Sequence, residues 1–169
     1  MSTSESGASR AVRLVATVAL AAALLAACGE GPKRPPPTER EWIVNAAVFI
    51  GDLDEGLQLS ANGGSDLASA RRALHDESDL YVMVVAYTRF GGCHQTLLNI
   101  GVPSPRARKV ETTLTLVCRR FERSSVLFTR AMTGSDPKTL LAATRTALGA
   151  SPLLYRAKAE LDALRPAPG

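Results

Sequence analysis

The sequence predicts an all-α protein, an antiparallel up-down bundle of four to five helices held by one disulfide. Three observations support this fold class. Apolar residues recur every three or four positions after residue 38, which is the period of helices packed on one side. Residues that favour helix starts precede these stretches, and glycine follows most of them. The intervening loops are short, and short loops join antiparallel neighbours.

The first helix is expected to begin after Thr38, because Thr38 and Glu41 have the spacing of a capping box. Its apolar residues continue at helical spacing, and it should end in the segment 60–65, which is rich in glycine and polar residues. The apolar positions are Trp42, Ile43, Ala46, Ala47, Phe49, Ile50, Leu53 and Leu57.

A second helix is expected from Ser65 and Asp66, with a kink at Gly91-Gly92 and an end at Gly101. The β-branched run 81–85 within it is also compatible with a strand, but its neighbours fit a helix better.

Three further helices are expected, and each begins at a Ser-Pro or Asp-Pro pair. The third should start at Ser104-Pro105 and end at Gly134, the fourth should run from Asp136-Pro137 to Gly149, and the fifth should run from Ser151-Pro152 to a point before Pro166. The third carries the clearest apolar stripe, at Val110, Leu114, Val117, Phe121 and Phe128.

The first 27 residues have the pattern of a secretory signal peptide. Arg10 and Arg13 precede an uncharged apolar run over 14–27. Fourteen helical residues rise about 21 Å, which is short of the roughly 30 Å hydrocarbon core of a bilayer. A buried core helix is the alternative, but a proline-rich segment follows the run and nothing around it is amphipathic. We therefore expect residues 1–27 to be an export signal.

The end of this run, Leu25-Ala26-Ala27-Cys28, resembles the lipobox of bacterial lipoproteins. The resemblance covers only the first 28 residues and names no functional family. It implies a lipid on the Cys28 sulfur, cleavage between Ala27 and Cys28, and an extracytoplasmic place on the cell membrane, or on the outer membrane if the host has one. Two or three acyl chains would anchor the chain firmly.

The mature chain is expected to have three parts. Residues 28–37 form a lipidated cysteine and a proline-rich tether, residues 38–165 form the helical bundle, and residues 166–169 form a C-terminal tail. Without residues 1–27 the side-chain charge is a mild excess of basic residues. This excess is too small to predict nucleic-acid binding. An extracytoplasmic location also argues against a nucleic-acid partner.

Cys93 and Cys118 remain once Cys28 carries lipid, and two cysteines of an exported domain most often pair. They flank the predicted turn at 102–105 with a mismatch of roughly 7 Å along the helix axes, which a loop or kink has to absorb. A metal or nucleophile role for Cys93 and His94 is the alternative. Adjacent helical residues point about 100° apart, so these two do not readily converge on one atom.

Other chemical sites find little support, and no cofactor or metal is expected. A di-iron bundle needs Glu three positions before histidine, where this chain has Arg72 and Gly91. The segment 51–56 has the acidic spacing of a calcium loop, but Leu57 stands where such a loop requires glycine. His94 is expected to be partly buried on the stripe through Tyr87 and Leu98.

Charge is separated along the chain. Residues 39–79 hold nine acidic and three basic residues, whereas residues 80–169 hold five acidic and thirteen basic residues. Arg108, Arg119 and Arg130 recur every eleven residues and so share one helix face, with Arg123 nearby. This face is either solvated and complementary to the acidic helices, or a patch for anionic headgroups, cell-wall polymers or an acidic partner.

The sequence thus favours a lipid-anchored envelope protein with an interaction or scaffolding role, and no enzyme motif is found. Its partners would be the membrane, through lipid on Cys28, and an envelope protein or anionic polymer. The alternative is an extracytoplasmic small-ligand binder with a pocket between helices near Tyr87, Phe90 and His94.

Overall fold

The structure is a computed structural model that describes residues 35–165. Within this range the chain is helical and contains no strand, which confirms the all-α class. The helices are α2 (Glu39–Ser60), the 3₁₀ turn η1 (Ala61–Gly63), α3 (Leu67–Ala73), α4 (Glu77–Gly91), α5 (Cys93–Ile100), α6 (Arg108–Gly134), α7 (Pro137–Leu148) and α8 (Ser151–Asp162). The predicted signal peptide, Cys28 and most of the predicted tether lie outside the described residues.

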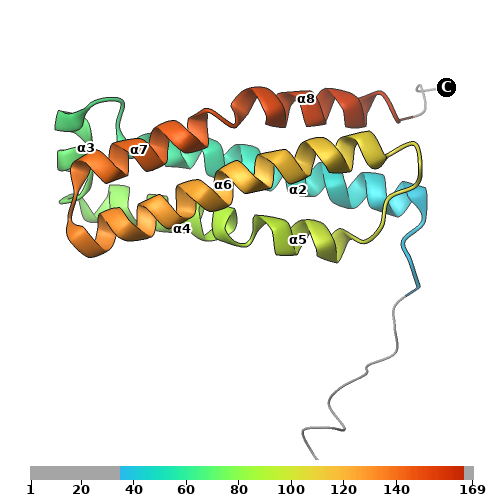
Figure 1. The fold of residues 1–169 in the computed structure, drawn as a ribbon, viewed down its shortest axis with the longest axis horizontal. Helices are drawn as coiled ribbons and strands as arrows, with labels where there is room; N and C mark the ends of the chain where they lie inside the picture. Colours follow the sequence, from blue (N-terminus) through green and yellow to red (C-terminus); the bar gives the residue numbers. More distant parts are fainter. Residues whose placement is uncertain (1–34, 166–169) are drawn as a thin grey trace, which may run out of the picture. The chain divides into compact units, whose positions relative to one another are not determined.

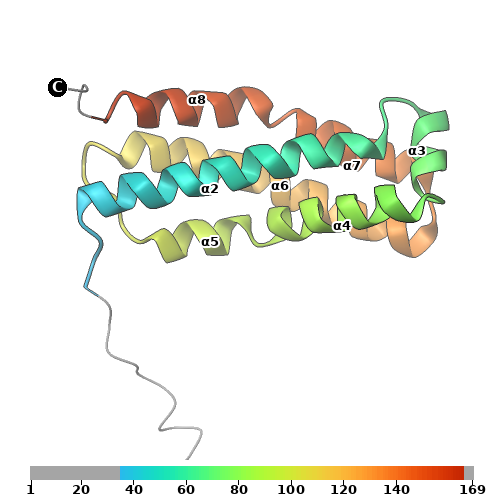
Figure 2. The same ribbon diagram turned by 180° about the vertical axis from the view of Figure 1, so that it is seen from behind.

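The helices form an antiparallel up-down bundle of four rods (Figure 1). The helix α2 is the first rod, α4 and α5 in line make the second, α6 is the third, and α7 and α8 in line make the fourth (Figure 2). Contacts join α2 to α4, α4 to α6, α6 to α7 and α8, and α8 to α2. The rods therefore surround one core, and α2 and α6 lie diagonally across it. The short helix α3 lies at the end remote from the start of α2 and contacts α7.

Several helix ends lie where the sequence predicts them. The Thr38 hydroxyl accepts a bond from the Glu41 amide at 3.3 Å, and the Glu41 carboxylate accepts one from the Thr38 amide at 2.8 Å. Asp136 caps α7 through the amides of Lys138 and Thr139. Gly101 ends α5 with a φ of 94°, a left-handed conformation in which a Cβ would also press on Pro37.

The predicted second helix is wrong as one element, because it divides into α3, α4 and α5. Asp76 provides a new start by accepting a bond from the Asp79 amide at 3.0 Å, so the chain turns between α3 and α4. Gly92 then separates α4 from α5, consistent with the poor helix propensity of glycine. The bundle consequently has more helices than the four or five expected. The run 81–85 is helical and lies within α4.

The predicted start of the third helix is also wrong by several residues. The chain makes a turn over 104–107, in which the Ala107 amide donates to the Ser104 carbonyl at 3.0 Å, and α6 begins at Arg108. The helix ends at Gly134 as expected, and the next residue, Ser135, takes a left-handed conformation.

Stacked aromatic rings join α4 to α6 in the core. Tyr87 stacks on Phe128 and Phe90 stacks on Phe121, with ring centroids 4.2 and 4.1 Å apart, and Tyr87 meets Phe90 edge-on. All four side chains are buried. Burial of such rings is among the largest apolar contributions to folding, so this cluster fixes how the two rods pack.

Candidate functional site

The cysteines Cys93 and Cys118 form a disulfide, as expected, with their Cα atoms 5.2 Å apart. The bond ties the first residue of α5 to the middle of α6, and both residues are buried. The late start of α6 explains how the predicted axial mismatch is absorbed. The helix α6 begins three residues later than predicted, at 108 instead of 105, and this removes about 4.5 Å of the roughly 7 Å mismatch along the helix axes.

The pairing leaves His94 without a cysteine partner, and His94 itself is exposed. The expectation of a partly buried His94 is therefore wrong. His94 is exposed because the helix breaks at Gly92, and the new helix α5 turns Cys93, Leu97 and Ile100 toward the core instead. The His94 amide donates to the Glu122 carboxylate at 3.0 Å. Among the described residues, no three metal-binding side chains of the His, Cys, Asp or Glu type gather in one place.

Two of the residues expected beside a pocket, Tyr87 and Phe90, are packed in the core. Tyr87 and Phe90 are 1% and 0% exposed because aromatic rings of α6 fill the space beside them. The Tyr87 hydroxyl lies 3.4 Å from the Thr144 hydroxyl. Burial raises the pKa of Tyr87 to about 12, although the contact with Thr144 opposes this shift, so the phenol stays neutral in the core.

The four arginines singled out in the sequence share the outer face of α6, and all are exposed. At 100° per residue, they lie within a sector of about 60° that also contains Thr112 and Val126. We call this set the arginine stripe. It comprises Arg108, Arg119, Arg123 and Arg130. From its first to its last residue the stripe extends about 33 Å along the helix.

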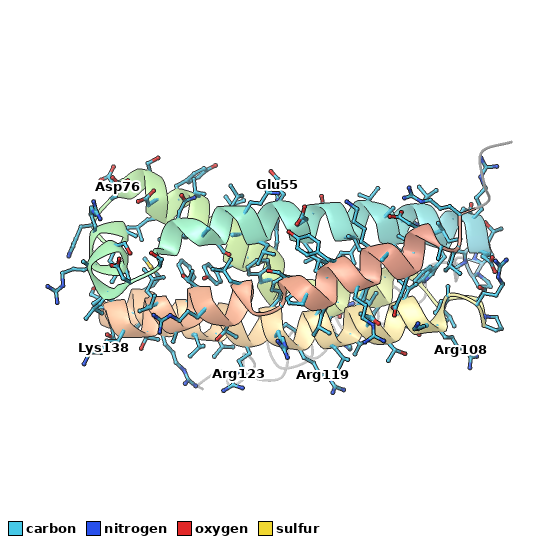
Figure 3. The ribbon with its side chains drawn as sticks, turned by 90° about the horizontal axis from the view of Figure 1, so that it is seen from above. Glu55, Asp76, Arg108, Arg119, Arg123 and Lys138 are labelled. Atoms are coloured by element: carbon cyan, nitrogen blue, oxygen red, sulfur yellow. A yellow bond between two sulfur atoms is a disulfide. The ribbon has the colours of Figure 1, made fainter. Side chains whose placement is uncertain are left out.

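The stripe faces away from the acidic helices. Figure 3 shows Arg108, Arg119 and Arg123 along one edge of the bundle, together with Lys138 at the start of α7. Glu55 and Asp76 lie along the opposite edge (Figure 3). Because α2 and α6 are diagonal in the bundle, the acidic side chains of α2 do not neutralise the stripe at contact distance.

Basic side chains elsewhere do form ion pairs. Glu160 on α8 accepts a bond at Oε2 from the Thr113 hydroxyl at 2.7 Å and one at Oε1 from Arg156 at 2.9 Å. The Lys109 Nζ atom lies 3.4 Å from the same Oε1. Arg89 pairs with Glu55 between α4 and α2. Within residues 35–165, no member of the arginine stripe has a carboxylate within 4.0 Å. The stripe is thus a line of positive charges that have no ion-pair partner in this part of the chain.

A groove bounded by α2, the turn before α6 and the segment that follows α8 is a second feature that the sequence did not predict, and we call it the α2–α8 groove. It has a volume of about 970 Å³ and lies beside the first half of α2. Val44 and Val48, on successive turns of α2, are 55% and 61% exposed. The groove is lined by Glu39, Arg40, Ile43, Val44, Ala47, Val48, Arg106, Leu164 and Arg165. Val44 and Val48 are four residues apart and lie on a different face of α2 from the buried Trp42 and Ala46. This pair of exposed valines is the sequence signal that could have indicated the groove.

Comparisons of the chain with protein-family models, with curated proteins and with solved structures found no match. No helix of the described part of the chain is long and apolar enough to cross a membrane.

Proposed function

We propose that the protein is a lipid-anchored, extracytoplasmic interaction module whose arginine stripe binds an anionic component of the bacterial envelope. The observation that carries this proposal is the stripe itself: four exposed arginines on one helix face, unpaired within residues 35–165. Arginine binds carboxylates and phosphates through two parallel hydrogen bonds, so such a line of arginines suits an extended anionic partner.

The chain direction supports a role close to the membrane. The bundle begins at Thr38, which caps α2, and α6 begins at the same end of the bundle as α2 (Figure 1). In the proposal, lipid on Cys28 holds this end near the bilayer through a short proline-rich tether. The stripe then begins close to the membrane, at Arg108, and continues away from it. An acidic envelope protein or an anionic polymer at the bilayer surface would be within its reach.

Photo-crosslinking in bacteria that express the full chain tests this proposal. A photoreactive residue replaces Thr112 on the stripe, and in a control it replaces Thr88, which is exposed on α4. We expect the Thr112 position to give a defined adduct and the Thr88 position to give none. Arg119→Glu with Arg123→Glu should abolish the adduct, because the charge of the stripe is reversed.

A second pair of substitutions distinguishes an effect of the arginine stripe from an effect of the total charge. Arg71→Glu with Arg72→Glu changes the total charge equally, but these exposed residues lie on α3. We expect this variant to retain the adduct. An adduct that survives reversal of the stripe, or identical adducts from Thr112 and Thr88, contradicts the proposal, as does the absence of any adduct.

A further inference from the structure

The α2–α8 groove combines an apolar floor with a cationic rim. Val44 and Val48 are more than half exposed, although apolar side chains of this size gain from being covered. Ile43, Ala47 and Leu164 extend the same apolar surface beneath and beside them. An exposed apolar surface rimmed by charge is typical of a binding site rather than of an ordinary solvated face.

The rim is made by Arg40, Arg106 and Arg165. Arg106 pairs with Glu39 at 3.4 Å and Arg165 pairs with Asp162 at 3.5 Å, while Arg40 has no carboxylate within 4.0 Å among the described residues. The Arg106 and Arg165 side chains are 68% and 52% exposed. Ion pairs that are so exposed are weak, so a ligand anion can replace either carboxylate without a large loss.

A smaller hollow of about 230 Å³ adjoins the groove further along α2 and α8 and shares Ala47 and Arg165 with it. It contains Asp54, whose Oδ1 atom is buried and has no hydrogen-bond partner in the described residues. The hollow also contains Asp162 and the basic Lys158, so acidic and basic side chains are mixed there. Arg40, on the first turn of α2, lies away from this hollow and has no paired carboxylate in the described residues, so an anion is attracted toward that part of the groove.

We propose that the α2–α8 groove binds a monomeric, single-chain anionic amphiphile of the fatty-acid type. Its acyl chain covers Val44, Val48 and Leu164, and its carboxylate meets the guanidinium groups of Arg40, Arg106 and Arg165. This site is separate from the arginine stripe and does not depend on lipid at Cys28. A failure here leaves the proposed envelope interaction untouched.

Fluorescence titration with the fatty acid cis-parinarate tests the proposal. The bundle contains its own core between Trp42 and Leu161, so residues 35–169 are used as a soluble fragment. We expect a saturable rise in fluorescence that palmitate reverses. Hexadecanol, which has the same chain without the charge, should compete about tenfold less well.

Three variants assign the binding to the groove. Val48→Asp places a charge on the floor and should abolish the fluorescence rise. Arg40→Glu with Arg165→Glu should weaken parinarate binding about tenfold or more while leaving the weak competition by hexadecanol unchanged. Val84→Asp on α4 is the matched control, because Val84 is 46% exposed and lies outside both the groove and the arginine stripe, and it should bind as the unmodified fragment does. Circular dichroism checks that each variant is folded.

Several outcomes would overturn the proposal. These are the absence of saturable binding, an equal loss of binding in Val84→Asp, and equal competition by palmitate and hexadecanol. Co-sedimentation of the fragment with phosphatidylglycerol vesicles without any parinarate binding would assign the groove to a bilayer surface instead, and this too would overturn it.

Discussion

Gly63 shows how closely the end of α2 approaches α7. A Cβ atom at this position would overlap the Thr144 hydroxyl and would lie 3.3 Å from the Met83 sulfur. Thr144 is buried beside Tyr87 and has little room to move. The φ of Gly63 is not in the left-handed region, so its backbone conformation does not require glycine. Glycine is needed here because there is no room for a side chain.

Gly63→Ala should lower the free energy of unfolding by about 1–3 kcal/mol, because the added methyl group overpacks the contact with α7. Urea unfolding followed by circular dichroism measures the change. Gly51→Ala is the matched control. No atom lies within 4 Å of its added Cβ, so it should leave stability unchanged or raise it by up to about 1 kcal/mol through helix propensity. Equal destabilisation by both substitutions would refute the packing argument.

Glu160 gives the bundle a pH-dependent contact between α6 and α8. Burial raises the pKa of its carboxyl, but hydrogen bonds from Thr113, Arg156 and Lys109 outweigh burial, and the net shift is downward. The folded state thus favours the carboxylate more than the unfolded state does. The stability that follows is present above the ordinary pKa of 4.5 and is lost as the pH falls through the lower folded value.

Glu160→Gln should therefore cost about 1–2 kcal/mol of unfolding free energy at pH 7, because charge-assisted hydrogen bonds are replaced by weaker ones. The difference from the unmodified protein should shrink as the pH falls below about 4. Chemical denaturation at a series of pH values measures it. Glu111→Gln, on the facing helix α6, is the control, because Glu111 has no ion pair among the described residues, and it should stay within about 0.5 kcal/mol. A cost for Glu160→Gln that is independent of pH would contradict the ionic explanation.

At the scale of the helices, the disulfide anchors the shortest part of the second rod. The helix α5 has eight residues and follows a glycine break, so its own helical hydrogen bonds contribute little stability. Cys93 fixes its start to α6, and Trp42 fixes its end by donating to the Gly101 carbonyl at 3.0 Å.

Cys93→Ser with Cys118→Ser should lower the unfolding free energy by about 3 kcal/mol, the loss expected for a loop of this length. Thermal unfolding with and without a reductant provides the measurement. The reductant should destabilise the unmodified protein and leave the double variant unaffected. Two alkylatable thiols in the purified, oxidised protein would show that the bond does not form.

The sequence predicts local features of these helices better than their spatial arrangement. The capping residues Thr38 and Asp136 and the stop at Gly101 were predictable, because each acts within one turn of its own helix. The break between α3 and α4 at Asp76 was not predicted, because the apolar residues keep their helical spacing on both sides of it. Periodicity alone therefore predicts one continuous helix. The α2–α8 groove depends on how two rods separated by about a hundred residues pack together, and no local pattern contains that information.

At the scale of the whole molecule, charge is distributed across the bundle as well as along the chain. The arginine stripe on α6 could be predicted from the helical period alone, and its four residues are exposed in the structure. Its diagonal position relative to α2 could not be predicted, because it follows from the order of the rods around the core. That order leaves an acidic edge and a basic edge on opposite sides of the molecule (Figure 3). Such separation favours an oriented encounter with an anionic partner.

We propose that the bundle works at a membrane through lipid on Cys28, and metabolic labelling with an alkyne fatty acid measures whether Cys28 carries that lipid. The unmodified chain should incorporate the label, and its mature N-terminus should be Cys28. Cys28→Ala should give an unlabelled, uncleaved chain, while Gly29→Ala, next to the lipobox cysteine, should behave as the unmodified chain does. Label that persists in Cys28→Ala, or an unmodified chain that retains residues 1–27 without label, would rule out the lipid anchor at Cys28.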